Sequence, residues 1–248
     1  MEYTAKTRCR PSNVAVMRAV TIALLAALAA TPLNSQTPDP PRAFLLFIDD
    51  LHLDFRETPR TRALMQRLLR QVAREGDTWA VVTTGASSVN LAPTKDLTTL
   101  NPIVSRVTGN ALKPSERIVA PQASHGVSEM RNRADVAYAT AVRAVEGFAA
   151  AVPGAALTVF YVSAGYDTRA VPGPQPLLDA AKRARATVIA IRPGSSDDQA
   201  PAGVPDAEWR AFLEAAQASL RTLALETGGT TVFAPEDVDP VLRRFTKP

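Results

Sequence analysis

Apolar runs and apolar stripes alternate along the chain, and their spacing predicts alternating strands and helices. Residues 43–48 (AFLLFI) form a continuous apolar run, as in a strand buried on both faces of a sheet. Residues 157–162 (LTVFYV) and 187–191 (TVIAI) have the same character. Between such runs, apolar residues recur every three or four positions, which is typical of helices that cover a sheet. The two clearest helical stripes consist of Leu64, Met65, Leu68, Leu69 and Val72, and of Trp209, Phe212, Leu213, Ala216, Leu220 and Leu223.

Strand–helix alternation of this kind predicts an α/β fold. We expect a doubly wound, mostly parallel central sheet with helices on both faces, in three layers. In such sheets the ligand site lies at the carboxyl ends of the strands, near the point where the strand order reverses. The predicted strands are 43–48, 79–84, 88–91, 157–162, 187–191 and 230–233, and the predicted helices are 59–75, 94–107, 129–150, 176–185, 209–223 and 238–245, with a polar stretch without periodicity at 109–128.

The first part of the chain has the pattern of a secretory signal peptide. Arg18 precedes an apolar run at 19–30, and the small residues at its end suit a cleavage site. The run is shorter than the ~20 residues of a membrane span, so no stable span is expected after cleavage. The alternative is a buried N-terminal helix, which the prolines that follow would uncouple from the first strand. We therefore predict a secreted or periplasmic protein with translation starting at Met17, residues 1–36 as the signal peptide with its preceding segment, 37–42 as a Pro-rich linker and 43–248 as one domain.

Removal of the first 36 residues changes the charge balance. They hold four basic residues and one acidic residue, so the 28 basic and 24 acidic residues of the whole chain become 24 and 23. This near-neutral remainder gives no indication of a nucleic-acid partner. The single cysteine, Cys9, also lies in the removed segment, which excludes disulfides and thiol chemistry from the predicted domain.

Polar side chains follow two of the buried strands. Asp49, Asp50, His52 and Asp54 come after the first strand, and Asp167 lies five residues after the strand at 157–162. These loops are expected side by side at the carboxyl edge, where carboxylate oxygens suit a hard divalent cation such as Mg²⁺. The alternative is that the same side chains cap helices and satisfy loop backbone groups.

The segments FLLFIDDLHLDF, FYVSAGYD and LALETGGTTVF, in this order, resemble the von Willebrand factor A superfamily, most closely its acidobacterial branch of exported proteins. The resemblance implies a metal-ion-dependent adhesion site. Asp49 matches its first aspartate and Asp167 its third-loop aspartate, while Ser128 stands in for a threonine of the second loop. Two serine positions of the first loop are Leu51 and Leu53 here. The implied site is degenerate, and a rebuilt one would rely on Asp49, Asp50 and Asp167 and hold the cation weakly.

The leading hypothesis is a binding module rather than an enzyme, with a protein or an extracellular polymer as its ligand. His52 and Asp54 are predicted to contact that ligand, flanked by the stretch at 109–128. One alternative is a metal-assisted or serine-based hydrolase in the same crevice, with a triad drawn from Ser163, His52 and Asp167. The other is an inactive scaffold domain. Neither a phosphate-binding P-loop nor a Gly-x-Gly-x-x-Gly motif follows a predicted strand.

Overall fold

A computed structural model describes residues 40–118, 124–194, 199–234 and 237–245 of the chain. Residues 40–248 form one compact unit. The predicted signal peptide, the start at Met17 and the first part of the Pro-rich linker lie outside the described residues. The first strand begins at Arg42, one residue before the predicted domain boundary.

One sheet of six strands organises this unit, in the order β3-β2-β1-β4-β5-β6. All neighbours pair in parallel except β3, which runs antiparallel to β2 at one edge. The order reverses between β1 and β4, so these two neighbours form the switch point of the sheet. The strands are β1 (Arg42–Ile48), β2 (Thr78–Thr83), β3 (Asn90–Thr94), β4 (Ala156–Val162), β5 (Thr187–Ile191) and β6 (Thr230–Val232).

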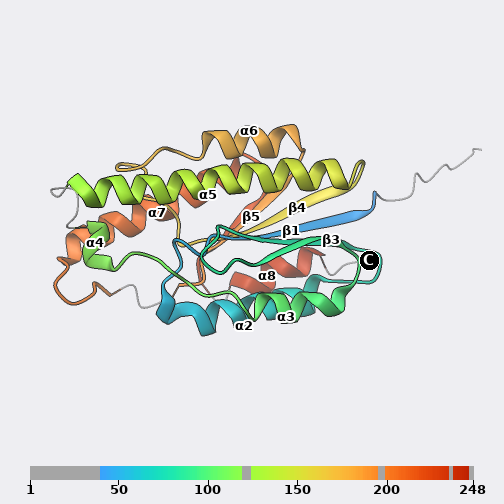
Figure 1. Cartoon of the computed structure of the whole chain (residues 1–248), viewed down its shortest axis with the longest axis horizontal. Coiled ribbons are helices and arrows are strands. Elements are labelled where there is room, and N and C mark those ends of the chain that lie inside the picture. The colour runs from blue at the N-terminus through green and yellow to red at the C-terminus, as the bar shows by residue number, and fades with distance from the viewer. Residues whose placement is uncertain (1–39, 119–123, 195–198, 235–236, 246–248) are drawn as a thin grey trace, which may run out of the picture. The chain divides into compact units, whose positions relative to one another are not determined.

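Helices cover both faces of the sheet, which confirms the predicted three-layer α/β class (Figure 1). Helices α5, α6 and α7 lie on one face, and α2, α3 and α8 lie on the other. The helices are α2 (Thr58–Val72), α3 (Leu100–Val104), α4 (Pro114–Ile118), α5 (Ser124–Ala151), α6 (Gln175–Arg183), α7 (Asp206–Leu225) and α8 (Val238–Leu242), with 3-10 turns η1 (Phe55–Glu57), η2 (Leu97–Thr99) and η5 (Arg243–Phe245).

Alternate residues of the central strand enter two separate cores. Along β1, Leu45 and Phe47 pack with residues of α5, α6 and α7. Phe44, Leu46 and Ile48 pack with residues of α2, α3 and α8 on the other face. Because side chains alternate across a strand, a run that is apolar throughout is what a strand between two helical layers requires.

Three predicted elements differ from the structure. The strand expected at 88–91 is β3, shifted to Asn90–Thr94. The helix expected at 94–107 is reduced to η2 and α3, because the Asp96 side chain caps a 3-10 turn by accepting from the backbone N–H of Thr98. The stretch at 109–128 is not one loop, since α4 lies within it and α5 begins at Ser124.

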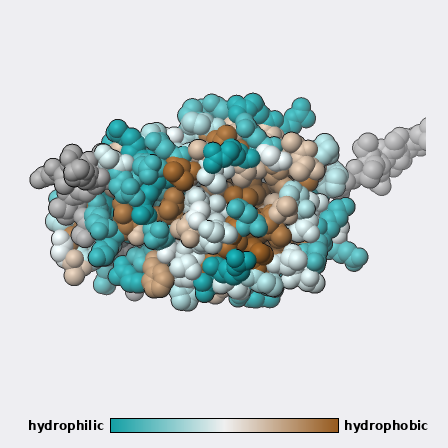
Figure 2. All heavy atoms as spheres, in the orientation of Figure 1, coloured by the Kyte–Doolittle hydropathy of each residue, from teal (hydrophilic) through white to brown (hydrophobic). Residues whose placement is uncertain are grey.

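Hydrophilic side chains cover much of the face seen in Figure 2, with apolar side chains showing between them. No helix in the described part of the chain is both long enough and apolar enough to cross a membrane.

Candidate functional site

The carboxyl ends of β2, β1, β4 and β5 bring the predicted polar loops together. Ile48 of β1 is in register with Val162 of β4, so Asp49 and Ser163 follow neighbouring strands at the same level. The backbone N–H of Asp49 donates to the carbonyl of Val162 at 2.8 Å, which fixes the two loops against each other. The adjacency expected from the sequence is therefore found at the switch point of the sheet.

Asp49 is fully buried, and protein donors engage both of its carboxylate oxygens. Oδ1 lies 2.9 Å from Nδ1 of His52. Oδ2 accepts hydrogen bonds from Ser163 Oγ at 2.7 Å and from the Tyr166 hydroxyl at 2.5 Å. These contacts replace the water that a buried carboxylate loses, and they make Asp49 the centre of a closed polar network.

Two buried tyrosines, Tyr161 and Tyr166, complete this network. The Tyr166 hydroxyl donates its hydrogen bond to Asp49, so the Tyr161 hydroxyl, 2.5 Å away, acts as donor to Tyr166. Burial, and after it the charge of Asp49, raises the pKa of both tyrosines well above the usual value. Both phenols therefore stay protonated and keep their donor roles. The Tyr166 ring also packs edge-on against His52, with ring centroids 4.6 Å apart.

Asp50 is equally buried but has a different set of partners. One of its oxygens accepts from the Thr84 hydroxyl and the other from the backbone N–H of Ser87. The Thr84 hydroxyl also accepts from the backbone N–H of Leu51 at 3.1 Å. Asp50 thus ties the loop after β1 to the loop after β2, which is the role that the alternative interpretation of these carboxylates predicted.

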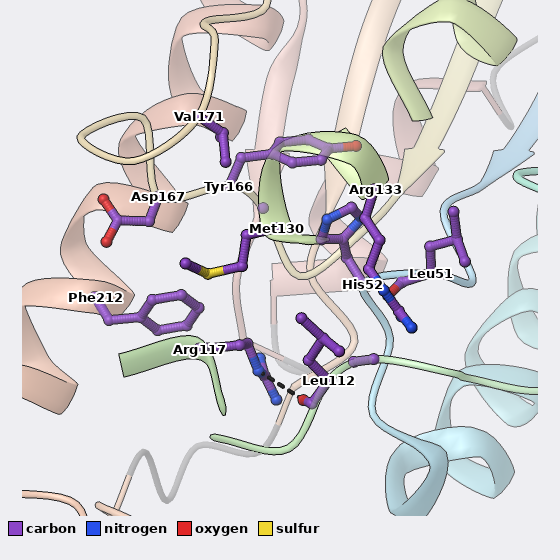
Figure 3. Close-up of a pocket in the computed structure, with 12 residues that line it drawn as sticks. Leu51, His52, Leu112, Arg117, Met130, Arg133, Tyr166, Asp167, Val171 and Phe212 are labelled. Atoms are coloured by element: carbon purple, nitrogen blue, oxygen red, sulfur yellow. Dashed lines mark hydrogen bonds between the residues drawn. The ribbon is translucent and has the colours of Figure 1, made fainter. Parts of the chain in front are cut away.

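The remaining predicted site residues lie apart from this network. Asp167 forms a bidentate ion pair with Arg169, at 2.6 and 2.7 Å. Figure 3 shows its carboxylate directed away from Tyr166 and His52. Asp54 caps η1 and forms a bidentate pair with Arg56. Ser128 is exposed near the start of α5.

A divalent cation does not fit this arrangement of residues. Among the described residues, no three His, Cys, Asp or Glu side chains lie close enough together to hold a metal ion. Asp49, Asp50 and Asp167 were expected to share one cation, but each is directed to a different protein partner. Oxygen atoms that already accept short hydrogen bonds from fixed donors offer a cation no free ligand set.

The residues of the hydrolase alternative are also arranged differently from a catalytic triad. In a triad the histidine lies between the serine and the acid. Here Asp49 lies in the middle and accepts from both Ser163 and His52. Asp167, the acid of the predicted triad, is engaged by Arg169 instead.

Two adjoining hollows lie beside the network at the carboxyl edge, and both are lined by His52, Arg117 and Phe212. The narrower one, drawn in Figure 3, has a volume of about 30 Å³, room for a water molecule. The wider one has a volume of about 340 Å³ and extends toward α7 and the end of β5. Its aromatic wall consists of Trp209 and Phe212, which stack with ring centroids 5.4 Å apart.

Arg117 is a residue of this site that the sequence analysis did not single out. It lies in α4, in a stretch without periodicity, and its side chain is only 12% exposed. The Nε–H donates to the carbonyl of Leu112 at 2.9 Å (Figure 3), and the guanidinium lies over the Phe212 ring, 5.5 Å from its centroid. Tyr166 and Thr84 were missed as well, because each acts from a loop other than the one that holds its aspartate.

Comparison with known proteins gives matches among solved structures alone. No family model and no curated protein sequence matches this chain. One similar structure is described as "von Willebrand factor type A from Catenulispora acidiphila", with 15% identity and a TM-score of 0.48, over 84% of this chain and 42% of that one. Another is an uncharacterized membrane-spanning protein from Vibrio fischeri, with 14% identity and a TM-score of 0.24, over 82% of this chain and 95% of that one. This chain therefore spans less than half the length of the first of these structures.

Proposed function

We propose that this chain is an exported binding module that holds a protein or an extracellular polymer at the carboxyl edge of its sheet, without a resident divalent cation. The observation that carries the proposal is that the buried carboxylates at this edge hold the loops, while an open hollow lies beside them. Asp49 and Asp50 are buried and fully engaged in holding the loops together. The hollow beside them is open and lined by aromatic and arginine side chains, the types enriched at binding hot spots.

An exposed aromatic side chain next to the wider hollow supports this assignment. Phe55 lies in η1 between Asp54 and Arg56, which both line the hollow, and it is 68% exposed. Leu225 is equally exposed, at 69%. It is the last residue of α7, shortly before the start of β6, and therefore lies toward the opposite edge of the sheet. The two positions form a matched pair for testing which edge meets the ligand.

We expect a photo-crosslinking amino acid at position 55 to form adducts with proteins or extracellular polymers of the organism that produces this chain. The same amino acid at position 225 should form few. The measurement is the yield of adducts after irradiation, with and without a chelator of divalent cations. Equal yields from both positions, or loss of the position 55 adducts on chelation, would contradict the proposed function.

Divalent cations should leave the thermal stability unchanged. A site with a millimolar dissociation constant would stabilise the protein by about 1.4 kcal/mol at about 10 mM metal. For a domain of this size that corresponds to a rise of about 3–6 °C in Tm. We expect no such rise with Mg²⁺, Mn²⁺ or Ca²⁺, because the carboxylates already have protein donors. A rise that disappears in Asp49→Ala would restore the metal-binding hypothesis.

Export itself is tested by the mature N-terminus. If residues 1–36 carry a signal peptide, N-terminal sequencing of the protein from its native host should begin between Ala30 and Thr37. Retention of Met1 or Met17 on an intracellular form would rule this part of the proposal out.

A further inference from the structure

From the surroundings of Arg117 we infer that the wider hollow binds a carboxylate attached to an apolar group, with Arg117 as its anchor. This inference rests on the proposed function and specifies the chemistry of the ligand. It depends on three features of the hollow: an incompletely paired guanidinium, a small excess of positive charge, and an apolar wall within reach of both.

The first feature is the state of the Arg117 guanidinium. Among the described residues, its one hydrogen bond runs from Nε to the Leu112 carbonyl. Its nearest carboxylate is Asp54, with Nη2 and Oδ2 4.0 Å apart, longer than a hydrogen bond. Asp54 is already held by Arg56 through two bonds of 2.8 and 3.1 Å. Within the described part of the chain, the two terminal amino groups of Arg117 thus make no hydrogen bond, and they can pair with a group that enters the hollow.

Burial also changes the pKa of this guanidinium. The loss of water around it lowers the pKa of Arg117 well below its usual range, to about 10, and Asp54 only partly offsets this effect. A charged group in this condition gains from an anion that replaces the lost solvation. The pKa agrees with the geometry, which by itself indicates an anion site.

The charge of the hollow selects the kind of anion. Among the described residues, three arginines line it, namely Arg56, Arg117 and Arg192, and two carboxylates, Asp54 and Glu57. The formal excess of one positive charge matches a monoanion better than a phosphate dianion. The planar fork of a guanidinium also pairs with a carboxylate through two parallel hydrogen bonds.

The walls indicate what the carboxylate is attached to. Phe212 and Trp209 stack on each other along α7, and Leu213, Pro114 and Pro193 add apolar surface around them. The Phe212 ring lies directly beside the Arg117 guanidinium. A ligand that pairs its carboxylate with Arg117 can therefore place an aromatic or aliphatic group against Phe212 and Trp209.

The direct test compares an acid with its uncharged amide on the same protein. The first pair of probes is 4-phenylbutyrate and 4-phenylbutyramide. The second is an N-acetylated tripeptide ending in phenylalanine, with a free or an amidated carboxyl end. We expect the acid of at least one pair to bind about tenfold or more tightly than its amide by calorimetric titration. Tighter binding of the tripeptide acid would identify a protein chain end as the source, and tighter binding of phenylbutyrate a small organic acid.

Variants assign the effect to Arg117. Arg117→Gln should remove the preference for the acid, while Arg117→Lys should keep part of it because the charge remains without the fork. Asp54→Asn should strengthen binding of the acid, since it removes the competing carboxylate and leaves a residue that still caps η1. Arg183→Gln, which removes an exposed arginine paired with Glu146 on α5, serves as the control and should change nothing.

The inference is overturned if acid and amide bind equally in both pairs, if neither acid binds, or if Arg117→Gln retains the preference while its Tm matches that of the wild type. These outcomes are independent of the crosslinking at position 55. A protein that forms adducts at that position but does not distinguish acid from amide would keep the proposed function and lose the carboxylate site.

Discussion

Replacing Asp49 with alanine should lower the free energy of unfolding by about 3–5 kcal/mol, because it leaves buried donors without an acceptor. Ser163 and Tyr166 both donate to Oδ2 of Asp49, and His52 lies against Oδ1. Asp49 and Ser163 are fully buried, so water cannot replace the lost acceptor. Urea denaturation, followed by circular dichroism, measures the loss as a shift of the midpoint at constant slope.

Two further variants show whether the effect comes from the buried network. Asp49→Asn keeps the volume and one carbonyl acceptor, and hydroxyl groups can reverse their donor roles, so its cost should be smaller than that of alanine. Asp96→Ala removes an exposed carboxylate that, among the described residues, accepts hydrogen bonds from Thr98 alone, so the loss of stability should be smaller still. If Asp49→Ala were no more damaging than Asp96→Ala, the closed network around Asp49 would not be a structural centre.

The same network shows how far the sequence predicted the site. The apolar runs located β1 and β4 within one residue at each end, and parallel neighbours bring their carboxyl ends together. That reasoning correctly placed the two loops side by side, although the partner of Asp49 in the second loop is Ser163 and not the expected Asp167. It could not show which way the side chains turn, because the donors to Asp49 and Asp50 include Tyr166 and Thr84 from two other loops.

Periodicity also fails for short elements. Helix α4 has five residues, less than two turns, so it leaves no repeating stripe in the sequence. Arg117 lies within it, and its environment depends on Phe212 of α7, 95 positions later in the chain. A contact between a non-periodic segment and a distant helix becomes visible only once the layers of the fold are assembled.

Replacing Gly165 with alanine should be the most damaging glycine substitution in the loop that presents Tyr166. Gly165 has a φ of +86°, a conformation that costs a residue with a side chain about 1–2 kcal/mol. In addition, a Cβ there would lie 2.2 Å from the backbone oxygen of Ala216 in α7. The loop would have to move away from α7, which would pull Tyr166 from Ser219 and from Asp49. We expect a loss of at least about 3 kcal/mol in the free energy of unfolding.

Two other glycines separate the backbone effect from the close contact. Gly154 has a φ of +77° with open space around it, so Gly154→Ala should cost only the conformational part, about 1–2 kcal/mol. Gly147 is exposed within α5, where a Cβ would meet nothing within 4 Å, so Gly147→Ala should stabilise the protein by about 0.5–1 kcal/mol. Urea midpoints should therefore fall in the order Gly147→Ala, wild type, Gly154→Ala, Gly165→Ala. Equal midpoints for Gly154→Ala and Gly165→Ala would mean that the close approach of α7 to the Tyr166 loop costs nothing. The position of Tyr166 beside Asp49 would then not depend on Gly165.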